Sequence, residues 1–386
     1  MKVAYIVGTY PTPSEQFIER EVRALGELGV EVTVYPLACG EEVACPWCVL
    51  GRHVWLGMLP RTWRAIRRFP AGKLAGLSLT AWREFPGGLD RAARVARAVE
   101  GRGIEHVHAH FATKPAAVGL MVAAMTGLPF TLSAHARDVF VDGVALAEKV
   151  AAARRVAVCS RAARDALEER IAPALHGRLW VVRHGLDASR FEFAADRPVH
   201  SPVRVLAAGR FVEKKGFDVL IDAMAQLGDC ACELAGSGPL EDALRREVDR
   251  LGLAERVTFP GWLPPAELGE RMAAADVLVV PSRVARDGDR DGVPNVLLEA
   301  AAVGLPIVAC DAGGIDEFVH NAETGRLVPP GDPELVAGAV RSVLSTPETT
   351  RRFARAARKK LENEYDLRDN VKLLMESVLR PGPTES

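Results

Sequence analysis

The chain alternates short apolar, strand-like runs with helical patterns, and this alternation restarts once in the middle of the sequence. Apolar strands separated by helices indicate a parallel sheet that is covered by helices on both faces. A polar stretch with two prolines, 196–202, separates the two series and predicts a domain boundary near 190–202. The expected strands are 3–7, 30–37, 106–111, 129–135, 156–160 and 179–184, then 203–208, 230–235, 257–260, 277–280 and 307–310.

This pattern predicts an α/β protein of two doubly wound, Rossmann-like domains, over residues 1–195 and 196–365. The length of 386 residues also favours two domains. The last helical stretch and tail, 366–386, either cross back onto the first domain or cap the second, and the sequence leaves both open. Ligands bind at the carboxyl ends of parallel strands, so we expect them in a central cleft that the two domains face.

The charge and the apolar runs restrict the class of protein. The 49 Lys and Arg against 50 Asp and Glu give a net charge of -1, which argues against a globally basic nucleic-acid binder. No run approaches 18 apolar residues, and Met1 leads directly into the first strand, so we expect neither a membrane span nor a signal peptide. The odd number of cysteines, seven, without a framework spacing favours a cytoplasmic location.

Two local features have competing interpretations. Cys45 and Cys48 are spaced like a redox pair, but that motif should follow a strand and open a helix, so two loop thiols are favoured. The segment 52–102 carries eleven Lys and Arg against three acids, with Trp, Phe and Leu between them. It suits an interfacial helix on anionic lipid, hence peripheral contact with the inner face of the membrane, and equally a solvated basic face with an apolar stripe in the core. Nucleic acid is a poorer partner for it.

A glycine and a cluster of cations follow the first strand of the second domain. Gly209 permits close backbone approach at the strand end, and Arg210, Lys214 and Lys215 lie within the next six residues. An arginine offers a rigid fork and a lysine a movable point charge to a diphosphate. The alternative is a surface loop whose charges are solvated.

An acidic, glycine-containing loop, 287–295, leads into a second helix. The residues at the helix start, 292–295, offer backbone N–H groups and the positive end of the helix dipole to an anion. Asp291 lies in the loop that faces this anion site. Glu299 lies one turn inside an otherwise apolar helix, where an unpartnered carboxylate would be costly, and it can accept hydrogen bonds from two vicinal hydroxyls.

These motifs together resemble the retaining glycosyltransferases of family 4, which have the GT-B fold. The nearest subgroup in pattern is that of the exopolysaccharide (colanic-acid-type) transferases, because of the acidic run 287–292. The match covers about residues 2–345, with the motifs in order in both halves: 10–18, 108–112, 133–138, 184–187, 209–216, 236–239, 291–299 and 304–306. One position departs from the family, which usually has a pair of glutamates where this chain has Asp291 and Glu299.

The resemblance implies a role for each matching residue. Arg210 and Lys215 would hold the donor diphosphate, Glu299 the ribose and Asp291 the sugar, with His135 at the reacting centre. The residues implied in catalysis are His135, Arg210, Lys215 and Asp291. Those implied in donor binding are Gly209, Arg210, Lys215, Gly238, Asp291, Gly292, Val293, Pro294, Asn295 and Glu299. Those expected on the acceptor side are Gly8, Tyr10, Glu15, His110 and Asp138.

We therefore expect an enzyme that moves a hexose-type sugar from a nucleotide-diphosphate donor to a hydroxyl, with retention and without a metal or other cofactor. The acceptor is a glycan, a lipid-linked glycan or a small molecule, and a natural-product transferase, for instance for an aminocyclitol antibiotic, stays open. A nucleotide-sugar epimerase and a phosphorylase share the architecture. An alternative from another class is a non-catalytic nucleotide-sugar-binding protein. It would bind the donor but would lack the slow hydrolysis of the donor that a transferase often shows.

Overall fold

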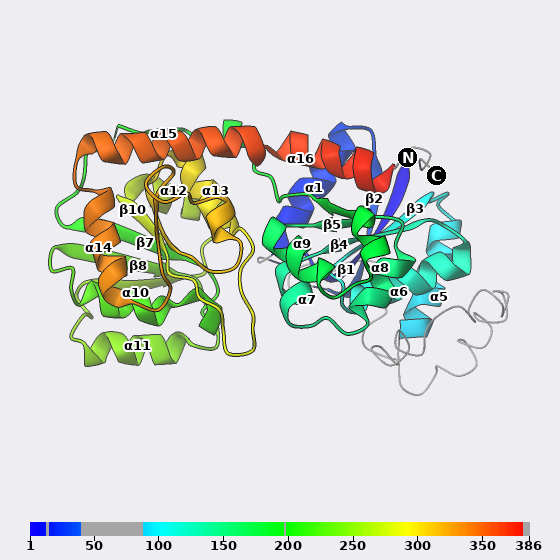
Figure 1. Cartoon of the computed structure of the whole chain (residues 1–386), viewed down its shortest axis with the longest axis horizontal. Helices are drawn as coiled ribbons and strands as arrows, with labels where there is room; N and C mark the ends of the chain where they lie inside the picture. The colour runs from blue at the N-terminus through cyan, green and yellow to red at the C-terminus, as the bar shows by residue number, and fades with distance from the viewer. Residues whose placement is uncertain (13–14, 40–87, 197, 381–386) are drawn as a thin grey trace. The chain divides into compact units, whose positions relative to one another are not determined.

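The computed structural model describes residues 1–12, 15–39, 88–196 and 198–380 (Figure 1). The chain divides into two compact units, one of Met1–Gly185 with Leu367–Ser386 and one of Leu186–Asp366. Each unit contains a six-stranded parallel sheet with helices packed on both faces (Figure 1). The prediction of two Rossmann-like α/β domains is confirmed.

The sheet of the first unit has the strand order β2-β1-β3-β4-β5-β6. The order reverses between β1 and β3, and a ligand site is expected at the carboxyl ends of the strands on either side of such a switch point. The strands are β1 Lys2–Tyr10, β2 Glu31–Cys39, β3 His106–His110, β4 Phe130–Ala134, β5 Val156–Val158 and β6 Leu179–Val181.

Alternate residues of β1 enter different cores, as the two-residue period of a strand requires. Ala4 and Ile6 pack with helices α5, α6, α8 and α9, whereas Tyr5 and Val7 pack with α1 and α16 on the opposite face. The helices of this unit are α1 Gln16–Glu27, α5 Gly88–Glu100, α6 Lys114–Thr126, α7 Ala136–Phe140, α8 Leu146–Ala152, α9 Arg161–Glu168 and α16 Leu367–Leu374.

The C-terminal helix α16 belongs to the first unit. Its Val371 and Leu374 lie in the same core as Tyr5, and the backbone N–H of Arg183 donates to Asn370 Oδ1 at 3.2 Å. A π-helical turn, Met375–Leu379, continues it and adds Val378 and Leu379 to that core. Of the two placements that the sequence leaves open, the structure has the one in which the last helix joins the first domain.

The sheet of the second unit has the order β12-β11-β10-β7-β8-β9, with its switch point between β7 and β10. Helices α10, α11 and α14 cover one face, and α12, α13 and α15 the other. The strands are β7 Val203–Ala208, β8 Cys230–Ala235, β9 Val257–Gly261, β10 Val277–Val280, β11 Ile307–Cys310 and β12 Arg326–Val328. The helices are α10 Phe217–Met224, α11 Glu241–Arg250, α12 Pro265–Ala274, α13 Asn295–Val303, α14 Pro333–Val343 and α15 Pro347–Glu364.

The boundary between the units lies ten residues before the predicted one at 195/196. Leu186 and Ala188 are buried in the core of the second unit, and the N–H of Leu186 donates to the carbonyl oxygen of Tyr365 at 2.9 Å. The N–H of Ala194 likewise donates to the carbonyl oxygen of Val303 at 3.2 Å. The polar stretch 196–202 is thus a surface segment of the second unit, and the boundary lies between Gly185 and Leu186.

The basic segment 52–102 is described only from residue 88, so its larger part, like the Cys45–Cys48 pair, lies outside the described residues. Its last part forms α5, whose Ala92, Val95 and Val99 are buried in the first core while Arg97 is exposed. For this helix the apolar stripe belongs to the core, and contact of residues 52–87 with lipid stays a prediction. None of the helices in the described ranges is long and apolar enough to cross a bilayer.

Candidate active site

In the second unit, the loops that follow β7 and β8 pack backbone against backbone. The N–H of Gly209 donates to the carbonyl oxygen of Ala235, and the N–H of Phe211 to that of Ser237, both at 2.9 Å. A Cβ at Gly236 would lie 1.9 Å from the carbonyl oxygen of Gly209, and one at Gly238 would lie 2.7 Å from the nitrogen of Phe211. Only glycine allows this approach, which forms a compact corner at the carboxyl ends of two neighbouring strands.

Lys215 is positioned by a tight turn that docks on the end of β10. A short 3-10 helix, Glu213–Lys215, ends at Gly216 with φ of 61°, and a Cβ there would lie 2.0 Å from the carbonyl oxygen of Pro281. The stem of Lys215 lies across Gly209, where a Cβ would meet Lys215 Cε at 3.4 Å. The lysine is therefore held over the end of β7, next to the switch point.

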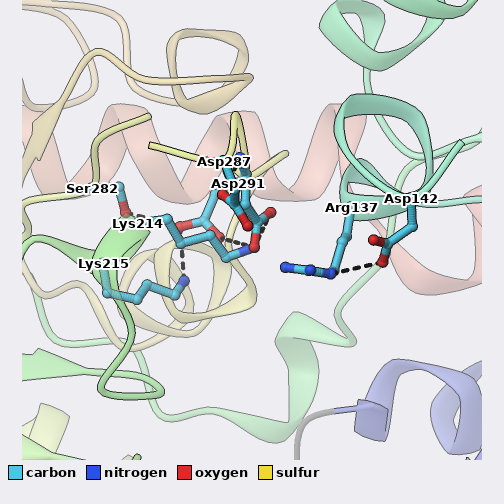
Figure 2. A network of polar contacts seen from close by, with 8 residues as sticks. Arg137, Asp142, Lys214, Lys215, Ser282, Asp287 and Asp291 are labelled. Carbon is cyan, nitrogen blue, oxygen red and sulfur yellow. Dashed lines mark hydrogen bonds and ion pairs between the residues drawn. The ribbon is translucent and has the colours of Figure 1, made fainter. Parts of the chain in front are cut away.

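Asp291 is the centre of a buried ion-pair network at this switch point (Figure 2). Its Oδ2 accepts hydrogen bonds from Lys215 Nζ at 2.8 Å and from Ser282 Oγ at 2.9 Å. Its Oδ1 lies 3.4 Å from Lys214 Nζ, which also donates to Asp289 Oδ1 at 3.0 Å. Burial alone would raise the pKa of Asp291, but the ammonium groups of Lys215 and Lys214 outweigh it and hold the pKa below its ordinary value.

Lys215 and Asp291 have hydrogen-bonding capacity that their contacts with each other do not use. An ammonium group has three N–H donors, and that of Lys215 uses one on Asp291. A carboxylate oxygen accepts about two hydrogen bonds, and Oδ1 of Asp291 has one neighbouring donor in the described chain, Lys214 Nζ at 3.4 Å. The side chains of Lys215 and Asp291 are 16% and 9% exposed. An anion can therefore bind Lys215, and a hydroxyl can bind Asp291, without breaking the pair.

The other residues predicted to bind the donor lie in the same unit. Arg210, next to Gly209, is exposed, and its guanidinium group forms no hydrogen bond or ion pair with any described residue. Helix α13 begins after Pro294 without a side-chain cap, and Oδ1 of Asn295 is buried without a partner in the described ranges. Glu299 is half-buried in the second turn of α13, and Gly292 and Val293 are half-buried ahead of it. Contacts within the second unit join Gly209, Lys215 and Asp291, and Arg210 directly follows Gly209 in the chain.

In the first unit, β3 lines up three buried histidines on one face of the sheet. His106, His108 and His110 alternate along the strand, so they share a face. Thr131 Oγ1 on β4 hydrogen-bonds both His106 Nε2, at 2.7 Å, and His108 Nδ1, at 2.8 Å. Ser133 Oγ lies 3.0 Å from His108 Nε2. The polar residues of β4 therefore satisfy the first two rings.

A second series of contacts joins His110 to the predicted catalytic residue, His135. His110 Nε2 lies 3.1 Å from Glu21 Oε1, and His110 Nδ1 lies 3.4 Å from His135 Nε2. His135 Nδ1 in turn lies 3.3 Å from His184 Nε2, and Phe17 stacks on His184 with ring centroids 4.0 Å apart. We call Glu21, His110, His135 and His184 the histidine chain.

Burial sets the protonation of most of these groups. It lowers the pKa of His106 and of His184 to about 4, and that of His108 and His135 well below the ordinary value. Burial would raise the pKa of Glu21, but His110 and the hydroxyl of Tyr5 lower it below the ordinary value. Near pH 7 these four imidazoles are neutral and Glu21 is a carboxylate.

Of the residues expected on the acceptor side, His110 contacts the His135 ring. Asp138 Oδ2 accepts hydrogen bonds from the backbone N–H groups of His135, at 3.0 Å, and Ala112, at 2.8 Å, and so caps α7. Burial raises the pKa of Asp138 to about 7, against the lowering effect of those two hydrogen bonds. Of the others, Gly8 and Tyr10 lie at the end of β1, and Glu15 lies just before α1.

Sequence reasoning placed Lys214, Asp289 and His184 within motifs without listing them as site residues, and it did not name Glu21 or Ser282. Two signals could have found some of them. Glu21 occupies an otherwise apolar face of α1, four residues after Phe17 and four before the buried Leu25. Ser282 comes two residues after the end of the apolar strand β10, at the carboxyl end where ligands of such sheets bind.

Comparison with known proteins assigns this architecture. Residues 189–360 match the family of glycosyl transferases group 1. The amylovoran biosynthesis glycosyltransferase AmsK of Erwinia amylovora is 33% identical over 48% of this chain and 47% of its own length. WcaL of Salmonella typhimurium, named as a colanic acid biosynthesis glycosyltransferase, is 27% identical over 87% of this chain and 89% of its own.

The chain spans about half the length of most of the curated relatives that it matches. A solved structure, Anabaena Alr3699/HepE in complex with UDP and glucose, superposes with a TM-score of 0.71 over 99% of this chain and 100% of that one, at 19% identity. Two relatives carry the exopolysaccharide names that the acidic run predicts. The chain has the GT-B fold of two Rossmann-like domains, and residues 189–360 of its second unit match the glycosyl transferases group 1 family.

Proposed function

We propose that this protein is a retaining glycosyltransferase that moves a hexose-type sugar from a nucleotide-diphosphate donor to a hydroxyl of a glycan or lipid-linked acceptor. One observation carries the proposal: the Lys215–Asp291 pair, with unused donors and an unused acceptor, lies at the switch point of a group 1 domain. The UDP and glucose named with HepE and the polysaccharide pathways named for AmsK and WcaL support it.

In this proposal each residue acts on one part of the donor. Lys215 and Arg210 bind the diphosphate and neutralise the charge that grows on it as the bond to the sugar breaks. The free N–H groups at the start of α13 add to this stabilisation. Glu299 binds the ribose, and Asp291 accepts a hydrogen bond from a sugar hydroxyl.

The acceptor oxygen attacks the anomeric carbon from the side that the diphosphate leaves, which gives retention. The bond from that carbon to the phosphate oxygen breaks, the new glycosidic bond forms, and the acceptor's proton passes to the leaving phosphate. This route needs no carboxylate nucleophile and no metal. The proposal includes the cytoplasmic location that the sequence leads us to expect.

A panel of nucleotide-sugar donors against acceptors, read by mass spectrometry, tests this function. Lipid-linked glycans, soluble glycans and small hydroxylated molecules are compared side by side, and we expect a glycan or lipid-linked product. A small-molecule product would identify a natural-product transferase instead. Donor binding without transfer and without slow hydrolysis would identify a non-catalytic nucleotide-sugar-binding protein.

We expect turnover to be unchanged in EDTA. Asp287, Asp289 and Asp291 alternate as in a calcium loop, but the position of its bidentate glutamate holds Leu298. Lysine ammonium groups are partners of both Asp289 and Asp291, so they offset the negative charge that would attract a divalent cation. Loss of turnover on chelation, restored by Mg²⁺ or Mn²⁺, would refute the metal-free mechanism.

We expect Asp291 and Glu299 to differ in which part of the donor they affect. Glu299→Gln should raise the KM of all donors similarly, by about tenfold for one lost charge-assisted hydrogen bond. Asp291→Asn should change the ranking among donor sugars, because a site that binds a hydroxyl rejects a donor that presents it differently. Asp291→Glu restores the longer side chain that is usual in the family, and it tests whether the missing methylene group affects donor choice. A donor ranking that follows Glu299 and ignores Asp291 would exchange the two roles.

A further inference from the structure

The histidine chain links four side chains end to end inside the first unit, from Glu21 on α1 to His184 after β6. Every ring nitrogen between the two ends lies within 3.4 Å of a hydrogen-bond partner. We propose that Glu21 is a positioning residue: through His110 it fixes the ring nitrogen that carries the proton in His135 and in His184. For its effect on catalysis, the inference rests on the function proposed above.

The carboxylate of Glu21 fixes the direction of every hydrogen bond along the histidine chain. An ionised carboxylate only accepts hydrogen bonds, so His110 must donate to Glu21 from Nε2. With one proton on each ring, Nδ1 of His110 is then bare and accepts from Nε2 of His135. Nδ1 of His135 is bare in turn and accepts from Nε2 of His184. One anion therefore places all three protons on Nε2.

The surroundings hold Glu21 as that anion. Its side chain is 14% exposed, and its Oε1 accepts a hydrogen bond from Tyr5 at 2.7 Å in addition to that from His110. A buried carboxylate is stable only with such donors. The chain closes at His184, whose Nδ1 has no hydrogen-bond partner among the described residues. The one ring nitrogen of the histidine chain without a hydrogen-bond partner among the described residues is thus at the end opposite Glu21.

The same order decides what His135 presents to a substrate. Both of its nitrogens are engaged, as donor to His110 and acceptor from His184, so the ring is locked in orientation and tautomer. Without the charge at position 21 the order is free to reverse, because an amide can donate to His110 as well as accept from it. Removing the carboxylate of Glu21 should therefore change the tautomer of His135, although the two side chains are not in contact.

Nuclear magnetic resonance of the full chain labelled with ¹⁵N-histidine tests this directly at pH 7.5. Long-range ¹H–¹⁵N spectra report the tautomer of each ring, and single His→Gln variants assign the signals. We expect His110, His135 and His184 all to carry the proton on Nε2. A doubly protonated His110, or an Nδ1–H tautomer at His135 or His184 in the unaltered protein, overturns the inference.

Two variants separate the charge from the packing. Glu21→Gln should move His135 or His184 to a mixture of tautomers and lower kcat about 10- to 100-fold, the range for residues that orient a functional imidazole, with the donor KM nearly unchanged. Tyr5→Phe is the matched control, since it removes the other hydrogen bond to the same oxygen and leaves the carboxylate; its tautomers should match the unaltered protein. Unchanged tautomers in Glu21→Gln would also overturn the inference.

The two proposals fail separately. If the tautomers behave as expected and the protein transfers no sugar, the proposed function is wrong and the role of Glu21 stands. If the protein transfers sugar and the tautomers do not depend on Glu21, the inference is wrong and the function stands.

Discussion

Acidification from pH 6.5 to pH 4 is expected to destabilise the first unit by several kcal/mol. His106 is buried on β3 and its pKa is lowered to about 4, whereas in the unfolded chain it returns to about 6.5. Between these values the unfolded state binds the proton and the folded state does not, so stability falls as the pH falls. A shift of that size is linked to about 3 kcal/mol for His106 alone. His184 has the same direction and value, and the lowered pKa values of His108 and His135 act in the same sense. Asp138, whose pKa is raised to about 7, acts in the opposite sense and offsets part of this loss.

Hydrogen exchange read by mass spectrometry measures this effect element by element. Peptides from β3 and β4 should lose protection between pH 6.5 and pH 4.5, after correction for the intrinsic exchange rate. Peptides from β7 and β8, strands without histidine in the second unit, are the internal control. His106→Gln should weaken the pH dependence by about one proton, because it removes one titrating group. Equal protection of β3 at both pH values would contradict the burial of neutral imidazoles.

Most of the fold could be predicted from the sequence because both sheets consist of apolar parallel strands. The central strands β4, β5, β10 and β11 are buried on both faces, so their apolar runs are continuous and easily recognised. The exception is β12, Arg326–Val328, an edge strand of three residues without a distinct pattern. The predicted domain boundary was wrong by ten residues because a polar composition identifies exposed segments of the chain, which need not coincide with the division between two cores. Leu186 and Ala188 look like ordinary linker residues until their core is known.

The site could be predicted only as separate parts. Gly209, Lys215 and Asp291 each stand out by residue type at the end of an element, and the family resemblance connects them. Their contact could not be read from spacing, because Lys215 and Asp291 lie 76 residues apart and meet only since β7 and β10 are neighbours. Glu21 could not be predicted for a different reason. Its charged neighbours in the sequence, Glu19, Arg20 and Arg23, make it look like an ordinary residue of an amphipathic helix. Its partner His110 lies 89 residues away on strand β3.

Arg210→Ala and Lys215→Ala are each expected to lower kcat/KM for the nucleotide sugar about 10- to 150-fold without unfolding the protein. One charge-assisted hydrogen bond to a diphosphate is worth on the order of 1.5–3 kcal/mol, which corresponds to that range. Arg210 is exposed, and little apolar packing is lost with it. Lys215→Ala leaves Asp291 with Ser282 and Lys214 as partners, so the buried carboxylate keeps a counter-ion and the fold is retained.

Calorimetric titration with a nucleoside diphosphate and with the corresponding nucleoside locates the loss. Both variants should weaken binding of the diphosphate and leave that of the nucleoside nearly unchanged, since the lost contacts are to phosphate. Arg246→Ala is the matched control: Arg246 is an exposed arginine on α11 that pairs with no described residue. If Arg210 and Lys215 bind different phosphate oxygens independently, the double variant should lose the product of the two factors. Wild-type turnover of either single variant at limiting donor would show that the diphosphate binds elsewhere, and the pair with Asp291 would then be a structural ion pair of the switch point.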